Sequence, residues 1–233
     1  MSSIYNEKYI QVTYKDSNLV YPLKLCSFLI KKFNIKKGSK ILDIGCGNGL
    51  ISKAFIILGM DMYGLDISTN GEKIFEPNKF LTHDLSKKNY PFDNNFFDFI
   101  FSKSVVEHMN EPDILIDESF RMLKNGGELI CMTPSWKHNY KESFYIDHTH
   151  VTSFTRYSLE TICELSGFIS KCEYFYQLPL TWTYPILNIF RFIIQKLPIP
   201  YKPLNNFPWP NKINKIIRFS KEAMLLCKAT KNL

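Results

Sequence analysis

The sequence lacks the features that define several classes of protein. Its six cysteines include no C-x-x-C pair, so we expect neither a zinc knuckle nor a disulfide scaffold, but free thiols in a reducing cytoplasm. No uncharged apolar run has the length of a membrane span, and the first nine residues lack the basic start and apolar core of a signal peptide. There is no repeat of fixed period. We therefore expect one globular domain over residues 1–233, located in the cytoplasm.

Acidic residues are absent from one long segment. Between Tyr174 and Lys221 there is no Asp or Glu, and the segment holds seven of the twelve prolines. The rest of the chain holds 22 basic and 22 acidic residues, so the whole net charge of +7 lies in this segment. Its seven basic residues are Arg191, Lys196, Lys202, Lys212, Lys215, Arg218 and Lys221, and its aromatic residues include Trp182, Phe190, Phe192, Phe207 and Trp209. Such a shift in composition predicts an inserted unit, residues 178–220, with its own role.

Strands and helices alternate along the remaining chain. In the N-terminal segment, residues 1–37, Leu19, Leu23, Cys26, Ile30 and Phe33 recur at helical spacing, with Asp16 or Ser17 as the N-cap. Strands are expected at 40–44, 61–66, 79–84, 97–102, 128–134, 168–177 and 222–229, and helices at 49–58, 110–127 with Asn110 as N-cap, and 158–167. The alternation predicts an α/β fold: a Rossmann-like, doubly wound, mostly parallel seven-stranded sheet with helices on both faces.

Between the first two strands lies a turn with three alternating glycines, in "ILDIGCGNG". Its G-x-G-x-G spacing differs from the G-x-G-x-x-G that cradles a pyrophosphate, which the carboxylate of Asp43 would repel. An acid at this place suits a ligand with a cationic amine and a sulfonium. Asp66, at the end of the second strand, suits ribose hydroxyls, and Asp84, at the end of the third, suits the exocyclic amine of adenine.

Taken in order, these motifs resemble the class I S-adenosylmethionine-dependent methyltransferases. The resemblance rests on "ILDIGCGNG", Asp66, Asp84, "FSKSVVEHM" and "LKNGGELICMTP", and covers about residues 38 to 175. It implies S-adenosylmethionine as cofactor. The residues that it implies in the cofactor site are Asp43, Gly45, Cys46, Gly47, Asn48, Gly49, Asp66, Ile67, Asp84, Leu85 and Ser102.

Simpler interpretations of these cofactor residues stay open. The glycines can form a tight turn that binds nothing, and Asp84 can be a helix cap or a surface acid. Ser102 can be a satisfied hydroxyl at a strand end. Cys46 reads as a small filler residue, because no activating base is adjacent to it in the sequence.

Three histidines are the candidates for removing a proton from the methyl acceptor. His148 and His150 lie in "YIDHTHVTSFT", residues 145–155, after the fifth expected strand, and His108 follows the fourth. The alternative is that they only hold the loop through backbone hydrogen bonds. Asp147, His148 and His150 form a D-H-x-H run that could bind a metal, but this pattern is weak and we predict no metal site.

The acceptor class is narrowed by an absence. Members of the resembled family that methylate exocyclic or amide nitrogens often carry an Asn/Asp-Pro-Pro-aromatic run at the fourth strand, and this chain has "SKSVVEH" there instead. We therefore expect O-methylation of a small molecule: a sugar, a nucleotide-linked or lipid-linked glycan precursor, or a quinone-type lipid. An RNA methyltransferase and a non-catalytic binding protein are the alternatives. The basic insertion is expected to be a substrate-facing lid that recognises a phosphate through Arg191 and Arg218 or touches the anionic inner face of a membrane. Nucleic acid is the less favoured partner, because no basic stripe extends beyond the insertion.

Overall fold

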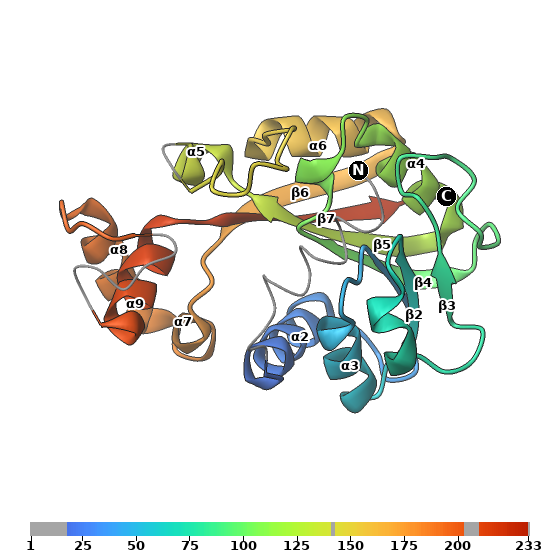
Figure 1. Cartoon of the computed structure of the whole chain (residues 1–233), viewed down its shortest axis with the longest axis horizontal. Coiled ribbons are helices and arrows are strands. Elements are labelled where there is room, and N and C mark those ends of the chain that lie inside the picture. The colour runs from blue at the N-terminus through green and yellow to red at the C-terminus, as the bar shows by residue number, and fades with distance from the viewer. Residues whose placement is uncertain (1–17, 141–142, 203–209, 233) are drawn as a thin grey trace.

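A seven-stranded sheet organises the chain. The computed structural model describes residues 18–140, 143–202 and 210–232. Its strands are β1 (Lys40–Ile44), β2 (Asp61–Asp66), β3 (Phe80–Thr82), β4 (Phe97–Lys103), β5 (Leu123–Pro134), β6 (Phe168–Phe175) and β7 (Met224–Lys231). Their order is β3-β2-β1-β4-β5-β7-β6, and β7 is antiparallel to both neighbours while the other pairs are parallel (Figure 1). The predicted α/β fold is confirmed.

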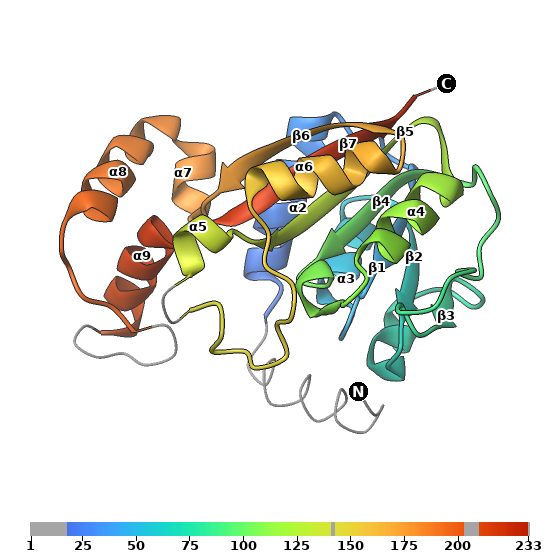
Figure 2. The same cartoon turned by 90° about the horizontal axis from the view of Figure 1, so that it is seen from above.

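Helices cover both faces of the sheet (Figures 1 and 2). The helices α2 (Val20–Phe33) and α3 (Leu50–Ile57) lie on one face, and α4 (Asp113–Met122) and α6 (Arg156–Leu165) on the other. Successive side chains of a strand point to opposite faces, so Ile41 of β1 packs with α2 and α3 while Leu42 packs with α4 and α6. Both faces are apolar, which explains why the parallel strands read as continuous hydrophobic runs.

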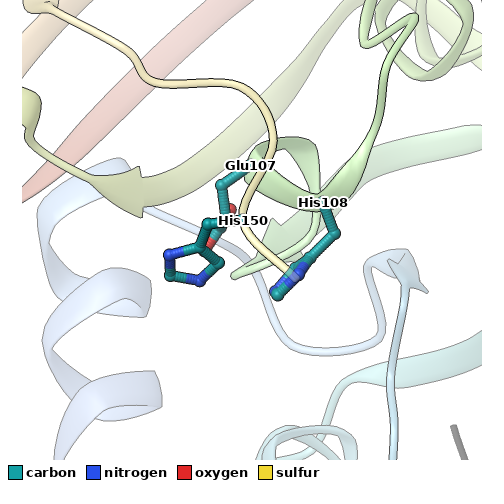
Figure 3. A group of neighbouring side chains, drawn as sticks. All are labelled: Glu107, His108 and His150. Carbon is teal, nitrogen blue, oxygen red and sulfur yellow. The ribbon is translucent and has the colours of Figure 1, made fainter. Parts of the chain in front are cut away.

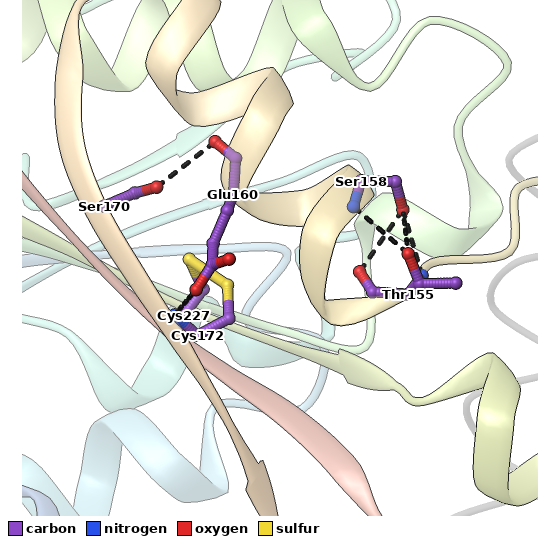
Figure 4. The surroundings of a disulfide bond; sticks show 6 residues. All are labelled: Thr155, Ser158, Glu160, Ser170, Cys172 and Cys227. Atoms are coloured by element: carbon purple, nitrogen blue, oxygen red, sulfur yellow. Dashed lines mark hydrogen bonds between the residues drawn. A yellow bond between two sulfur atoms is a disulfide. The ribbon is translucent and has the colours of Figure 1, made fainter.

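The helix ends depart from the expected caps. The N-cap of α4 is Pro112, not Asn110, and that of α2 is Leu19, whereas Asp16 and Ser17 lie outside the described residues. At α6 the side chain of Thr155 accepts from the backbone N–H of Ser158 at 3.1 Å, and the Ser158 hydroxyl accepts from the N–H of Thr155 at 2.9 Å (Figure 4). This reciprocal capping box begins the helix two residues earlier than expected.

Two of the six cysteines form a disulfide, which corrects the expectation of free thiols. Cys172 of β6 and Cys227 of β7 stand directly opposite each other in the antiparallel pair and are bonded (Figure 4). They are 55 residues apart in the sequence, so no local spacing pattern announces the pair. The free cysteines are Cys26, Cys46, Cys131 and Cys163, all buried.

The basic segment forms a helical unit between β6 and β7. It contains α7 (Pro179–Thr183), a short 3-10 turn η3 (Pro185–Leu187), α8 (Asn188–Lys196) and α9 (Asn211–Lys221). The three helices lie beyond the carboxyl end of β6 (Figures 1 and 2), which is the edge of the sheet where β1 and β4 also end. Phe207 and Trp209 lie outside the described residues. Within the described part of the chain, no helix is both long and apolar enough to span a bilayer.

Gly64 in the middle of β2 provides a test of the packing. A Cβ at this position would collide with the ring of Phe75, so we predict that Gly64→Ala lowers the free energy of unfolding by about 1–3 kcal/mol through overpacking. Urea denaturation measures the loss. Adding Phe75→Leu to this variant should recover part of the stability, whereas strictly additive losses would contradict the proposed contact.

Candidate active site

A cavity of about 380 Å³ lies where β1 and β4 end, against the helix α2. The glycine turn after β1 forms one wall, and Tyr21 of α2 and Lys103 of β4 contribute to the others. The full lining is Asn18, Tyr21, Pro22, Asp43, Gly45, Cys46, Gly47, Asn48, Leu50, Ile51, Phe101, Lys103 and Lys215. Five of the residues predicted to bind the cofactor are in this lining, which places the cavity at the crevice expected for a doubly wound sheet.

The glycine turn owes its shape to positive backbone angles. Gly45, Gly47 and Gly49 have φ values of 74°, 56° and 71°, in the left-handed region that side chains rarely adopt. A Cβ on Gly45 would collide with Val105, which follows β4, whereas a Cβ on Gly47 would meet nothing within 4 Å. The first glycine therefore lets the segment after β4 pack onto the turn, and the second leaves open space beside the cavity.

Asp43 is the buried anion of the cavity. Its side chain is only 3 % exposed, and Oδ2 accepts a hydrogen bond from the Ser52 hydroxyl at 2.5 Å. Burial raises the pKa of Asp43 to about 7. A cationic ligand group beside this carboxylate would favour its ionised form. The cavity thus fits the ammonium end of S-adenosylmethionine.

Asp66 supports the glycine turn from behind. Its Oδ2 accepts the N–H of Gly47 and its Oδ1 the N–H of Ser68, both at 2.8 Å. The residue is almost fully buried, and burial raises its pKa. Ile67, the next residue, is half-buried. Asp66 is outside the cavity lining, so its contact with the ribose stays a prediction.

Two other predicted cofactor residues lie away from the cavity lining. Asp84 bonds the backbone and hydroxyl of Ser86 at 3.1 and 2.7 Å, contacts that lower its pKa. Leu85 packs against the core beneath α4. Their roles at the adenine stay predictions.

Ser102 faces away from the cavity. Phe101 and Lys103 on either side of it line the cavity, and neighbouring strand residues point to opposite faces. The Ser102 hydroxyl is buried without a hydrogen-bond partner in the described structure. The structure therefore does not bring this hydroxyl to the cavity, and its contact with the cofactor stays a prediction.

His108 and His150 come together from two loops (Figure 3). His108 belongs to the 3-10 turn η2 (Val106–His108) after β4, and His150 lies between the short helix α5 (Trp136–Asn139) and α6. Their ring centroids are 4.7 Å apart. The N–H groups of Val151 and Thr152 donate to the Glu107 carbonyl and join the two loops. His148, by contrast, is exposed, so of the three candidate bases the structure groups two.

Hydrogen bonds select one tautomer for both rings. Nδ1 of His150 lies 2.6 Å from the carbonyl of Phe144, which can only accept, so this nitrogen carries the proton. The Thr149 hydroxyl donates to Asp147 at 2.6 Å and lies 2.8 Å from Nδ1 of His108, so that nitrogen must donate as well. Burial lowers the pKa of both histidines. Each neutral ring therefore keeps an unprotonated Nε2 that can accept a proton.

Glu107 completes this cluster and was not predicted. It is fully buried; Oε2 accepts from the Thr133 hydroxyl at 2.8 Å, and Oε1 has no partner among the described residues. One potential ligand atom from each of Glu107, His108 and His150 lies within 4.8 Å of the others, close enough to hold a cation (Figure 3). This group differs from the Asp147–His148–His150 run considered from sequence. The sequence held one signal for Glu107, which is an acidic residue next to His108 and a few residues after an expected strand.

Lys103 and Lys215 are the cationic residues of the cavity, and sequence reasoning missed both. Lys103 ends β4; burial lowers its pKa while the charges of Glu107 and Asp43 raise it. A charged residue directly after an apolar strand could have drawn attention to it. Lys215 belongs to α9, and no local pattern could have shown that the inserted unit reaches this cavity.

Comparison with known proteins agrees with this geometry. The model of a methyltransferase domain family matches residues 20–169. The chain belongs to the class I S-adenosylmethionine-dependent methyltransferases. Its cofactor is S-adenosylmethionine, as predicted.

One curated relative and two solved structures show what the chain is similar to in sequence and in fold. The ubiquinone biosynthesis O-methyltransferase of Pelagibacter ubique is 33% identical over 116 residues, covering 45% of this chain and 48% of that protein. The chain thus spans about half the length of such curated relatives. A methyltransferase structure from Archaeoglobus fulgidus has a TM-score of 0.64 at 19% identity, covering 95% of this chain and 97% of that one. Phosphoethanolamine N-methyltransferase 2 of Haemonchus contortus, bound to S-adenosylhomocysteine, has a TM-score of 0.64 at 22% identity, covering 99% and 57%.

Cofactor affinity should depend on the ionisation of Asp43. Lowering the pH from about 8 to about 6 protonates a carboxyl whose pKa is about 7, so the affinity for S-adenosylhomocysteine should fall about tenfold. Calorimetric titration at several pH values measures it. Asp43→Asn should bind weakly at every pH, and Asp113→Asn, an exposed acid on α4, should keep the wild-type dependence. An unchanged pH dependence in Asp43→Asn would assign the titration to another group.

Proposed function

We propose that this methyltransferase transfers its methyl group to a hydroxyl oxygen of a small molecule. The observation that supports it is the pair of neutral imidazoles, His108 and His150, each with an unprotonated Nε2, in the loops that follow β4 and β5. When bound, the cofactor supplies an electrophilic methyl carbon. A hydroxyl also needs a group to take its proton, and an imidazole is the commonest such group in enzymes.

The segment after β4 links the histidine cluster to the wall of the cavity. Val105 packs on Gly45 of the glycine turn. Lys103 lines the cavity, where burial lowers its pKa and the nearby charge of Glu107 raises it. In the proposed reaction the hydroxyl proton passes to Nε2 of His108 or His150 as the oxygen attacks the methyl carbon. Bound in the cavity, S-adenosylmethionine would supply the methyl carbon, and its sulfur would keep the electrons of the carbon–sulfur bond.

Among small-molecule acceptors, we favour a lipid-linked or quinone-type hydroxyl over a phosphorylated one, because the two arginines expected to bind a phosphate are engaged within the protein. Arg191, expected to clamp a phosphate, stacks on Tyr176 at 3.7 Å and bonds Asn188 and Gln195 at 3.1 Å each. Arg218 bonds Glu222 at 2.7 Å. Both guanidinium groups thus have partners within the protein. A relative named for O-methylation in ubiquinone biosynthesis supports the same choice.

Methyl transfer to a panel of acceptors tests the reaction class. Labelled S-adenosylmethionine is incubated with a polyprenylated catechol, a nucleotide sugar, phosphoethanolamine and a short RNA. We expect label on an oxygen of the catechol, whereas label only on an oxygen of the nucleotide sugar would keep O-methylation but contradict the preference for an acceptor without phosphate. Label only on RNA or on the phosphoethanolamine nitrogen would contradict the proposal, and cofactor binding without any transfer would favour a non-catalytic binding protein.

Replacing the clustered histidines should separate catalysis from binding. We predict that His108→Ala or His150→Ala, whichever residue is the base, lowers turnover about 10²–10⁴-fold, because the hydroxyl proton loses its acceptor. The affinity for S-adenosylhomocysteine should stay near that of the wild type. The exposed His148 is the comparison, and His148→Ala should cost much less. Equal turnover in all three variants would show that neither His108 nor His150 accepts the proton.

A further inference from the structure

The inserted unit exposes a continuous apolar stripe. Ile186, Ile189, Phe190, Ile193 and Leu197 are each 44–68 % exposed. They recur at the three- to four-residue spacing that places side chains on one face of a helix. No residue of α8 is buried, so the stripe is not part of the described core and stays largely open to solvent. A helix that serves only to cap the domain would turn its apolar face inward.

The neighbouring helix extends this surface. The helix α9 packs against α8 and exposes Ile213 and Ile216 at 46 % and 47 %. We call these two residues and the α8 stripe the insertion face. Scattered exposed apolar residues are ordinary on protein surfaces, but seven on η3, on α8 with the residue that follows it, and on α9 form a patch of the kind that marks an interaction site.

The charges around the insertion face have a single sign. Lys196, Lys212 and Lys215 are exposed on the same two helices, and no acid occurs from Tyr174 to Lys221. Since Arg191 and Arg218 have internal partners and Lys221 donates to the Leu197 carbonyl, these three lysines are the exposed cations of α8 and α9. Apolar side chains flanked by lysines match the surface of an anionic bilayer. The apolar side chains are buried at the acyl boundary, and the lysines are attracted to the anionic headgroups.

We propose that the insertion face docks onto an anionic lipid bilayer. The apolar stripe favours a bilayer over RNA. Proteins bind the phosphates of RNA through charge and hydrogen bonds and its bases through stacking, and exposed isoleucines provide none of these contacts. Lys215 lies at once on α9 and on the wall of the cofactor cavity, so docking brings the cavity beside the bilayer. Access of a lipid-tailed acceptor by this route rests on the proposed function, whereas the docking itself does not.

Flotation with vesicles tests the docking. The full chain is mixed with vesicles of phosphatidylglycerol and phosphatidylcholine, or of phosphatidylcholine alone. We expect it to float with the anionic vesicles, to float little with the neutral ones, and to be largely released at high salt. Ile189→Ser with Ile193→Ser should raise the lipid concentration for half-maximal binding at least tenfold. Lys196→Gln with Lys212→Gln should weaken binding and its salt dependence together.

Matched variants elsewhere on the surface are the controls. Leu165→Ser with Ile169→Ser removes apolar residues that are 83 % and 61 % exposed, and Lys53→Gln with Lys171→Gln removes the same charge. Both should float as the wild type does, and S-adenosylhomocysteine binding checks that every variant is folded. A wild-type chain that does not float, or that floats equally well after the isoleucine changes, would overturn the proposal. Tighter binding to poly(U) than to the vesicles, or a dimer abolished by the isoleucine changes without flotation, would also overturn it.

Discussion

Buried carboxyl groups at one edge of the sheet are the constraint around which the site is arranged. Asp43, the residue before the last in β1, is 3 % exposed, and Glu107 is fully buried just beyond β4. Burial raises the pKa of each to about 7, which shows how poorly this environment solvates a charge. Lys103 lies within range of both charges but is itself penalised by burial. A cationic ligand group beside Asp43 would supply the missing positive charge, which links the fold to a cofactor with an ammonium group.

The parallel pairing of β1 and β4 makes this arrangement possible. Asp43 is in register with Phe101, so the strand ends lie side by side and the segments that follow them meet. The glycine turn then needs left-handed angles, and the missing Cβ of Gly45 admits Val105. The segment carrying Glu107 and His108 is thereby held against the turn. The loop of His150 is attached to that segment through the Glu107 carbonyl, so the wall of the cavity and the two histidines share one support.

The sequence predicted the parts of the protein that local patterns encode. Apolar runs and glycines predicted the order of strands and helices along the chain and the glycine turn with Asp43, and both histidines of the cluster were among the candidates. Asn110 was wrong as a cap because Pro112, with its fixed φ, begins the helix instead. The Cys172–Cys227 pair, the burial of Lys103 and the approach of Lys215 depend on strand pairing and on the packing of an inserted unit, which link residues far apart in the chain. The exposure of α8 is of the same kind: its composition suggested an anionic partner, but only the fold shows which side chains face solvent.

A crystal structure of the complex with S-adenosylhomocysteine tests the central claim most directly. The account predicts the ligand ammonium within hydrogen-bond distance of the Asp43 carboxylate. It also predicts that the ligand sulfur faces the Nε2 atoms of His108 and His150, with space for one acceptor hydroxyl between the sulfur and these two nitrogens. A ligand whose ammonium avoids Asp43, or whose sulfur faces away from both histidines, would contradict it.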